Sequence, residues 1–185
     1  MKYQALSLPG AYEIIPDVHQ DNRGSLTKLF DRTNFEQLGI DCQWNETLLS
    51  INKSQGVIRG FHYQAPPYGQ TKMIYCLQGA AQAYLLDIRQ GADTYGKIIT
   101  CHLSPETGNM LIVPIGVANA YMIEQDNTHI LYQLTSQYQP DYESGIRWDS
   151  VGLSLNWDNP IISERDSRLP KWEDFTTPFI WGENC

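Results

Sequence analysis

Two short motifs, each opened by a glycine, constrain the fold of this 185-residue chain more than any other feature. The first runs from Gly56 to Gln64 and reads glycine, five residues, then His-x-Gln. The second runs from Gly108 to Asn119 and reads glycine, five residues, Pro-x-Gly, two residues, then asparagine. The glycines and the proline are turn-forming residues between β-rich segments, so both motifs indicate a protein built from short strands and tight turns.

The spacing of the two motifs resembles the paired signatures of the cupins, in which three histidines bind a metal. Here only His62 remains, because Gln64 and Asn119 occupy the other two positions. Neutral amides are poor ligands for transition metals, and one histidine is too few for a site that needs three protein ligands. We therefore expect the barrel without the metal, and His62 must serve another purpose.

The remainder of the chain supports an all-β fold of the cupin type, a double-stranded β-helix (jelly roll) with a few short peripheral helices. No repeat or low-complexity tract divides the sequence, so we expect a single domain over residues 1–185. Helical turns are expected at Thr33–Leu38, with Thr33 as the cap, and after Ser163. The expected strands, separated by turn residues, are Val57–Tyr63, Thr71–Leu77, Ala81–Arg89, Lys97–Leu103, Met110–Val113, Ala118–Glu124 and Thr128–Thr135.

Composition excludes several classes of function. A formal net charge of -8 argues against binding to nucleic acid, which requires a basic face. The apolar runs are too short to span a membrane, and the first residues lack the apolar core of a secretory signal. Cysteines 42, 76, 101 and 185 are scattered, which indicates reduced thiols rather than disulfides or a zinc site. We therefore expect a cytoplasmic protein.

Cationic side chains gather around His62. Alternation along Ile58–Gln64 places every second residue, His62 among them, toward the barrel cavity. Lys72 on the next strand is costly to bury unless it has a partner or an anionic ligand. A lone histidine or lysine in a strand is usually structural, but this pair lies close to Arg59 in an acidic protein. Strict alternation turns Arg59 away from His62, unless the strand bulges at Gly60.

A longer series of motifs follows one order along the chain, from about residue 12 to residue 175. These motifs are Asp21-Asn-Arg-Gly24, Arg59-Gly-Phe-His-Tyr-Gln64, Gln70-Thr-Lys72, Asp87-Ile-Arg89, Tyr95-Gly96, Pro114-x-Gly116, Tyr132, Tyr138, Gly145-Ile-Arg-Trp148 and Ser163-Glu-Arg-Asp166. The series resembles the dTDP-4-dehydrorhamnose 3,5-epimerase family, whose members carry Arg-Gly-Leu-His-Tyr-Gln and Ser-Glu-Lys-Asp in the same places.

The resemblance implies a metal-free and cofactor-free isomerase that epimerises a nucleotide-linked 4-keto-6-deoxy sugar. By similarity, His62 removes a proton beside the C4 ketone and Asp166 orients that histidine. Lys72 stabilises the enolate oxygen, and Tyr138 returns a proton on the opposite face. These roles suit the chemistry, because a proton beside a ketone is far too weakly acidic for an unaided imidazole.

The resemblance also implies the groups that bind the substrate. Arg23 and Arg59 are expected on the diphosphate, a natural partner for guanidinium groups, and Gln64 is expected in the same pocket. Two positions depart from the family. Asn119 stands where the family has the histidine of Pro-x-Gly-x-Ala-His, and Lys28 stands where it usually has glutamate. The departures leave open the nucleotide (dTDP, CDP or GDP), the sugar (hexose or heptose) and the number of inverted centres.

Several functions therefore stay open at this point. Epimerisation at both C3 and C5 is the leading hypothesis, and inversion of one centre on a dTDP-, CDP- or GDP-linked sugar is the alternative because of Asn119. A non-catalytic cupin that only binds a sugar nucleotide would need Arg23 and Arg59, but it would not need all four catalytic candidates together. A metal-dependent cupin oxygenase conflicts with Gln64 and Asn119. By similarity, the protein is expected to form a homodimer.

Overall fold

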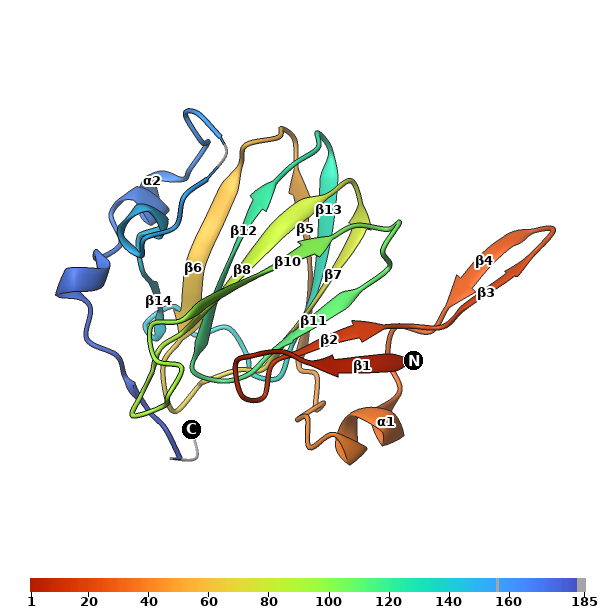
Figure 1. Ribbon diagram of the computed structural model, residues 1–185, viewed down its shortest axis with the longest axis horizontal. Coiled ribbons are helices and arrows are strands. Elements are labelled where there is room, and N and C mark those ends of the chain that lie inside the picture. The colour runs from red at the N-terminus through yellow and green to blue at the C-terminus, as the bar shows by residue number, and fades with distance from the viewer. Residues whose placement is uncertain (156, 183–185) are drawn as a thin grey trace.

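The computed structural model describes residues 1–155 and 157–182, and two antiparallel sheets facing each other dominate it (Figure 1). This arrangement confirms the predicted all-β jelly roll. One sheet has six strands, in the order β1 (Lys2–Ala5), β2 (Tyr12–Ile15), β11 (Met110–Val113), β7 (Lys72–Gln78), β13 (Thr128–Leu134) and β5 (Glu46–Asn52). The other has five, in the order β10 (Ile98–Leu103), β8 (Ala81–Asp87), β12 (Val117–Ile123), β6 (Ile58–Gln64) and β14 (Glu143–Gly145).

The core lies between the sheets, and further apolar clusters cover their outer faces. Ile74 and Leu111 of the six-stranded sheet pack in one cluster with Leu85 and Tyr121 of the five-stranded sheet. The C-terminal segment covers the outside of the five-stranded sheet, and helix α1 (Arg32–Gln37) covers part of the outside of the other. Because both faces of the five-stranded sheet are covered, all seven residues of its central strand β12 are buried.

The predicted strands are all present. Their ends agree with the structure to within one residue in most cases, and the long segment Ala81–Arg89 is divided into β8 and a short strand β9 (Arg89–Gln90). The sequence patterns did not identify β1 to β5, β14 or β15 (Phe179–Ile180). Near the C-terminus, β15 pairs in parallel with β9, so that Phe179 lies opposite Arg89 and Ile180 opposite Gln90.

The two helices differ in how well they follow the prediction. The cap predicted at Thr33 is wrong, because α1 begins at Arg32 and the side chain of Asp31 accepts the capping hydrogen bond from the Asn34 amide. Ser163 caps α2 (Glu164–Ser167) as predicted, accepting from the Asp166 amide at 3.0 Å. In the described part of the chain no helix is long and apolar enough to cross a membrane.

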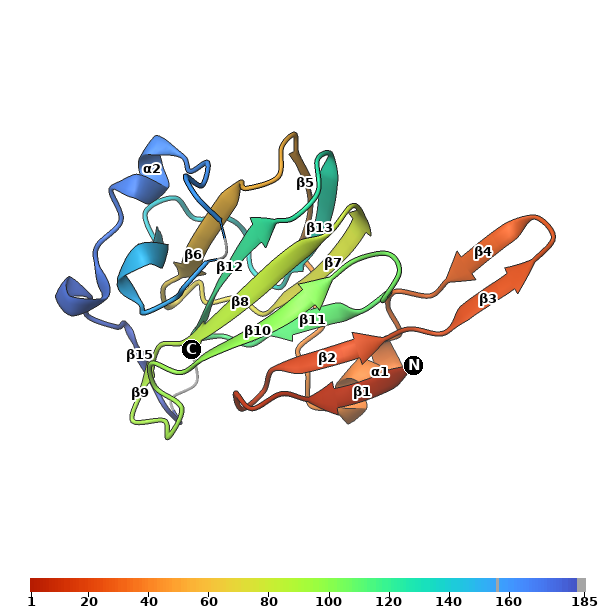
Figure 2. The ribbon, with the colours of Figure 1, turned by 45° about the horizontal axis from the view of Figure 1, so that its top comes forward.

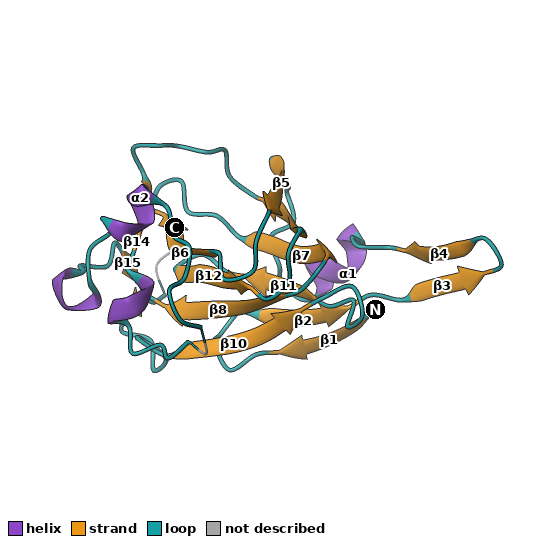
Figure 3. Ribbon diagram, turned by 90° about the horizontal axis from the view of Figure 1, so that it is seen from above, coloured by secondary structure: helices purple, strands orange, loops and turns teal. Residues whose placement is uncertain are grey.

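A hairpin and the C-terminal segment lie on opposite sides of the barrel (Figures 2 and 3). On one side, β3 (Val18–Asp21) and β4 (Gly24–Thr27) form a hairpin that extends away from the sheets and is exposed along nearly its whole length. On the other side, the C-terminal segment runs back over the five-stranded sheet. Its Trp172, Phe175 and Phe179 pack against that sheet.

Candidate active site

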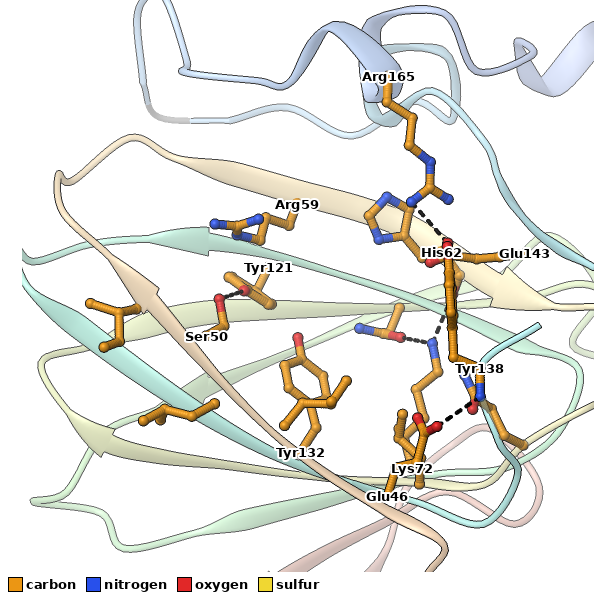
Figure 4. Close-up of a pocket in the computed structure, with 16 residues that line it drawn as sticks. Glu46, Ser50, Arg59, His62, Lys72, Tyr121, Tyr132, Tyr138, Glu143 and Arg165 are labelled. Atoms are coloured by element: carbon orange, nitrogen blue, oxygen red, sulfur yellow. Dashed lines mark hydrogen bonds and ion pairs between the residues drawn. The ribbon is translucent and has the colours of Figure 1, made fainter. Parts of the chain in front are cut away.

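A cavity of about 750 Å³ opens between the two sheets at the end where β5 and β13 face β6 and β12 (Figure 4). His62 and Arg59 reach it from β6, Lys72 from β7 and Asn119 from β12. Leucine and isoleucine side chains of β5 form part of the wall. The cavity is therefore of a size suited to a small molecule, with an apolar wall and a few converging polar groups.

A β-bulge at Gly60 brings Arg59 and His62 to the same cavity. His62 pairs with Asn119 and Arg59 pairs with Tyr121, so β6 holds one more residue than β12 across this interval. Gly60 has φ +118°, and a Cβ there would lie 2.5 Å from the Asn119 carbonyl oxygen, which leaves no room for a side chain. Strict alternation along Ile58–Gln64 is consequently wrong: Ile58 packs in the outer cluster, away from the cavity.

His62 and Asp166 form a buried pair beside this bulge. His62 Nε2 lies 2.8 Å from Asp166 Oδ1, and the Gly60 amide donates to the other carboxylate oxygen at 3.2 Å. Burial raises the pKa of Asp166, but the hydrogen bond and charge interaction with His62 outweigh it, so the pKa lies below its ordinary value. An ionised Asp166 accepts the Nε2 proton, which leaves the lone pair of a base on Nδ1.

Lys72 places a cation inside the cavity. Its side chain is buried, and Nζ donates to Asn119 Oδ1 at 2.7 Å and to the His62 carbonyl oxygen at 3.2 Å. Burial lowers its pKa from 10.5 to about 8, and the nearby carboxylate of Glu143 opposes that shift. Lys72 is thus a proton donor held between neutral oxygens, close to the backbone of the histidine.

Three tyrosines line the cavity, Tyr121, Tyr132 and Tyr138, and the family resemblance implies a catalytic role only for Tyr138. Tyr138 follows β13 on a loop at the mouth and is 53% exposed, and its amide donates to Glu46 Oε1 at 3.0 Å. Tyr132 lies within β13, on the sheet opposite His62, and burial holds its pKa well above the ordinary value. Alternation from Leu134 back to Tyr132 was the signal that could have placed Tyr132 inside the barrel.

An ion pair at the mouth was also missed. Arg165 of α2 lies 2.9 Å from the carboxylate of Glu143, and both residues line the cavity. Arg165, Arg59 and His62 also line a neighbouring pocket of about 450 Å³ that lies beside Asp166. The two hollows therefore share a border of two guanidinium groups, an arrangement that suits a phosphate or diphosphate.

The residues predicted to bind substrate fall into two groups. Arg59 and Asn119 line the cavity, and the Arg59 Nε donates to Asn52 Oδ1 at 2.9 Å, which orients the guanidinium. Gln64 is buried, but its amide bonds the backbone of Tyr68, Gln137 and Gln139, so it supports the loop that carries Tyr138 and does not line the cavity.

Arg23 and Lys28 lie outside the cavity of their own chain. Arg23 stands at the turn of the β3–β4 hairpin, where its side chain is 85% exposed and pairs with Asp21 at 2.6 Å. Lys28 follows that hairpin and pairs with Asp31 at 3.3 Å. Across residues 1–155 and 157–182, no three His, Cys, Asp or Glu side chains come together in a way that could hold a metal ion.

Comparisons with known proteins agree with this geometry. The sequence profile of the family described as dTDP-4-dehydrorhamnose 3,5-epimerase matches residues 5–174. The dTDP-4-dehydrorhamnose 3,5-epimerase of Sinorhizobium fredii is 32% identical over 173 residues, which cover 92% of this chain and 89% of that protein. The crystal structure of the Bacillus anthracis enzyme with TDP and PPi bound has a TM-score of 0.88 at 29% identity, covering 92% of this chain and 98% of its own.

A related enzyme with a narrower reaction is also similar. The structure of a 3'-monoepimerase from Streptomyces bikiniensis in complex with dTDP has a TM-score of 0.83 at 25% identity, covering 90% of this chain and 85% of its own. That protein is a double mutant in which a histidine and a tyrosine, 70 positions apart, are replaced. On the strength of the profile match, the identity to the curated enzyme and the shared fold, the chain belongs to the dTDP-4-dehydrorhamnose 3,5-epimerase family and is an isomerase.

Proposed function

We propose that this enzyme inverts both C3 and C5 of a dTDP-linked 4-keto-6-deoxy sugar. One observation carries the proposal: the His62–Asp166 pair faces a buried ammonium and a tyrosine across a single cavity. A base on one side, an acid on the other and a cation at the developing oxyanion are what inversion beside a ketone requires. The TDP and dTDP bound in the solved relatives support the choice of nucleotide.

The cationic rim supports binding of the diphosphate. Arg59 and Arg165 border both hollows, so a diphosphate between them leaves the sugar in the larger one, against His62 and Lys72. The tether from Asn52 uses only the Arg59 Nε, which leaves the two terminal nitrogens of the guanidinium to bind phosphate oxygens. Asn119 lies deeper in the cavity, where it contacts the sugar together with Lys72.

The first proton transfer belongs to His62. Its Nδ1 takes a proton from the carbon beside the ketone, and Asp166 stabilises the imidazolium that forms. The electrons move onto the C4 oxygen, where the Lys72 ammonium donates a hydrogen bond to the enolate. Removal of a single such donor typically costs about 100- to 1,000-fold in rate, so Lys72 accounts for much of the barrier reduction.

The second proton transfer requires an acid on the opposite face of the ring. The family resemblance implies Tyr138 as this acid. A specific observation favours Tyr132: it lies on the sheet opposite the one that carries His62 and is partly buried beside Asn119, whereas Tyr138 is half-exposed at the mouth. His62 and Tyr132 also have the 70-position spacing of the histidine and tyrosine replaced in the monoepimerase. We propose Tyr132 as the donor and Tyr138 as a group that closes over the substrate.

Three variants test these roles. His62→Ala should abolish exchange of the sugar's C3 and C5 protons with deuterated water. Tyr132→Phe should retain the first exchange and lose inversion, because the carbanion is then protonated only from the face of the base. If Tyr138→Phe shows that pattern and Tyr132→Phe inverts normally, the donor is Tyr138. Full exchange by His62→Ala would overturn the mechanism.

The nucleotide and the number of centres are tested with a substrate panel. The dTDP-, CDP- and GDP-linked forms of the same 4-keto-6-deoxyhexose are compared by kcat/KM, and a heptose analogue extends the series. We expect the dTDP-linked sugar to have the highest kcat/KM, and we expect both C3 and C5 to be inverted. Inversion at C3 alone would place this enzyme with the monoepimerases and assign the difference to Asn119.

We also propose that the enzyme is a cytoplasmic homodimer. The β3–β4 hairpin projects from the barrel, with Leu26 72% exposed, and the cavity wall on the edge strand β5 exposes Leu49 and Ile51. A hairpin lying against the β5 edge of a second copy would cover both apolar surfaces and bring Arg23 of the partner subunit toward the cavity. The free thiols of Cys42, Cys76 and Cys101 suit a reducing compartment.

Sedimentation of the full chain tests the dimer. A monomer at micromolar concentration would contradict it. For the role of the hairpin, Arg23→Ala should raise KM and leave kcat nearly unchanged, because the residue binds the diphosphate and not the reacting carbon. Lys171→Ala, at an exposed site away from the cavity, is the control for loss of positive charge.

A further inference from the structure

One buried side chain holds the loop on both sides of Tyr138. Gln64 Nε2 donates to the Gln137 carbonyl oxygen at 3.0 Å, and Gln64 Oε1 accepts from the Gln139 amide at 2.8 Å. The same Nε2 donates to the Tyr68 carbonyl oxygen at 2.7 Å. Gln64 therefore uses both of its N–H donors and its carbonyl oxygen, and two of the three bonds fix the peptide groups that flank Tyr138.

The loop depends on these bonds because it has no regular backbone pairing. Residues 137–139 lie between β13 and β14, outside the helices and strands. A further bond comes from β5, where Glu46 Oε1 accepts from the Tyr138 amide at 3.0 Å (Figure 4). Gln64 belongs to the five-stranded sheet and Glu46 to the six-stranded sheet. The direction in which the Tyr138 side chain leaves the backbone is therefore set from both sheets.

Gln64 is suited to test this arrangement because it does not itself reach the substrate. It is 2% exposed and does not line the cavity, whereas Glu46 and Tyr138 both do. It lies two residues from His62 on β6, so the strand that carries the base also sets the position of the tyrosine at the mouth. Only a carboxamide supplies two donors and an acceptor at once; a carboxylate has no donor, and an aliphatic side chain has neither.

We propose that Gln64 is a positioning residue that holds Tyr138 over the bound sugar nucleotide. This inference rests on the proposed function, in which Tyr138 closes over the substrate. When Gln64 is replaced, the bond from Glu46 keeps the loop attached, but the two peptide groups beside Tyr138 are free to turn. The tyrosine then spends less time over the substrate, so binding weakens and the chemical step changes little.

Steady-state kinetics on the dTDP-linked 4-keto-6-deoxyhexose compare the wild type with Gln64→Leu and Gln64→Glu. Leucine loses all three bonds, whereas glutamate keeps the length and the acceptor and loses at least one donor. We expect KM to rise about tenfold in Gln64→Leu and by less in Gln64→Glu, with kcat within about threefold of wild type, since a small misplacement of a group that holds the substrate has effects of this order. Gln125→Leu, in the exposed turn between β12 and β13, is the control for loss of a glutamine.

A double variant shows whether Gln64 acts through Tyr138. Tyr138→Ala should itself raise KM, and adding Gln64→Leu should then change KM by less than about twofold, because the side chain that Gln64 positions is already gone. A full second rise in KM would overturn the proposal, because Gln64 would then act by another route. A fall in kcat as large as the rise in KM, in Gln64→Leu alone, would also overturn it, because Gln64 would then act on His62 through β6.

Amide hydrogen exchange of the substrate-free enzyme tests the loop contacts apart from the reaction. A peptide that covers residues 136–140 should exchange about tenfold faster in Gln64→Leu than in the wild type, because the Gln139 amide loses its acceptor. A peptide from β12 should not change, which excludes general unfolding. Unchanged exchange in the loop, or a wild-type KM in both Gln64 variants, would overturn the proposal. If the wild type exchanges no substrate proton, the proposed function fails, and the amide exchange still shows whether Gln64 holds the loop.

Discussion

Replacement of Lys72 by methionine should make the protein more stable and inactive at the same time. Lys72 is buried, and burial lowers its pKa from 10.5 to about 8. A shift of this size corresponds to about 3 kcal/mol that the folded state loses at pH 7 by holding an ammonium away from water. Methionine has a similar length and carries no charge, so Lys72→Met removes this cost.

The dependence on pH distinguishes this cause from a general packing effect. The folded state loses the Lys72 proton above pH 8, but the unfolded chain retains it up to about pH 10.5. The cost is therefore fully present below pH 8 and disappears as the pH rises through that window; at pH 9.5 about 1 kcal/mol remains. The stabilisation by Lys72→Met should consequently be about 2 kcal/mol larger at pH 7 than at pH 9.5.

Urea unfolding, followed by tryptophan fluorescence, measures this difference at both pH values and at one fixed protein concentration. The hydrogen bonds that Lys72 donates to Asn119 and to the His62 carbonyl are lost in the variant at either pH, so their contribution largely cancels. The same variant should lose about 100- to 1,000-fold in kcat, since the enolate loses its donor. An identical change in unfolding free energy at pH 7 and pH 9.5 would refute the account of Lys72.

Three further predictions concern the neighbours of this lysine. The kcat/KM of the wild type should fall above a pH of about 8 as Lys72 loses its proton, and a profile that stays level to pH 10 would exclude the ammonium as the active form. Asp166→Asn should lower kcat by roughly 1,000-fold without unfolding the protein, because the amide no longer fixes the histidine tautomer; a loss under tenfold would show that His62 does not need the carboxylate. Gly60→Ala should cost at least about 2 kcal/mol in urea unfolding, because its Cβ would meet the Asn119 carbonyl oxygen at 2.5 Å, whereas Gly39→Ala, with open space around it, should cost about 1 kcal/mol. Equal costs for the two glycines would contradict the role of the bulge.

The barrel strands were predictable because their burial is periodic or continuous. Met110–Val113 is apolar at every position and is buried at every position, and its predicted bounds match those of β11. The hairpin β3–β4 has no comparable pattern in its sequence, because nearly all its residues are exposed and its apolar residues show no regular spacing. The same holds for Asp31, which caps α1 ahead of the predicted Thr33: both residues can cap a helix, and only the geometry decides between them.

The site was predictable where a motif carried it and not where cross-strand register decided it. His62, Lys72 and Asp166 follow from the motifs, and the structure brings them together. The bulge at Gly60 depends on how β6 pairs with β12, and that register could not be predicted from a single sequence. Tyr132 was among the motifs of the family resemblance but had no role assigned, and its place opposite the histidine emerges only when the two sheets face each other.

The most direct test of the account locates deuterium in the product. The wild type is incubated with the dTDP-linked 4-keto-6-deoxyhexose in deuterated water, and the C3 and C5 positions are read separately by NMR. Our account predicts one deuteron at each centre with both configurations inverted, and no deuterium at either centre with His62→Ala. Deuterium at neither centre in the wild type, or undiminished uptake in His62→Ala, would contradict the central claim that His62 removes these protons.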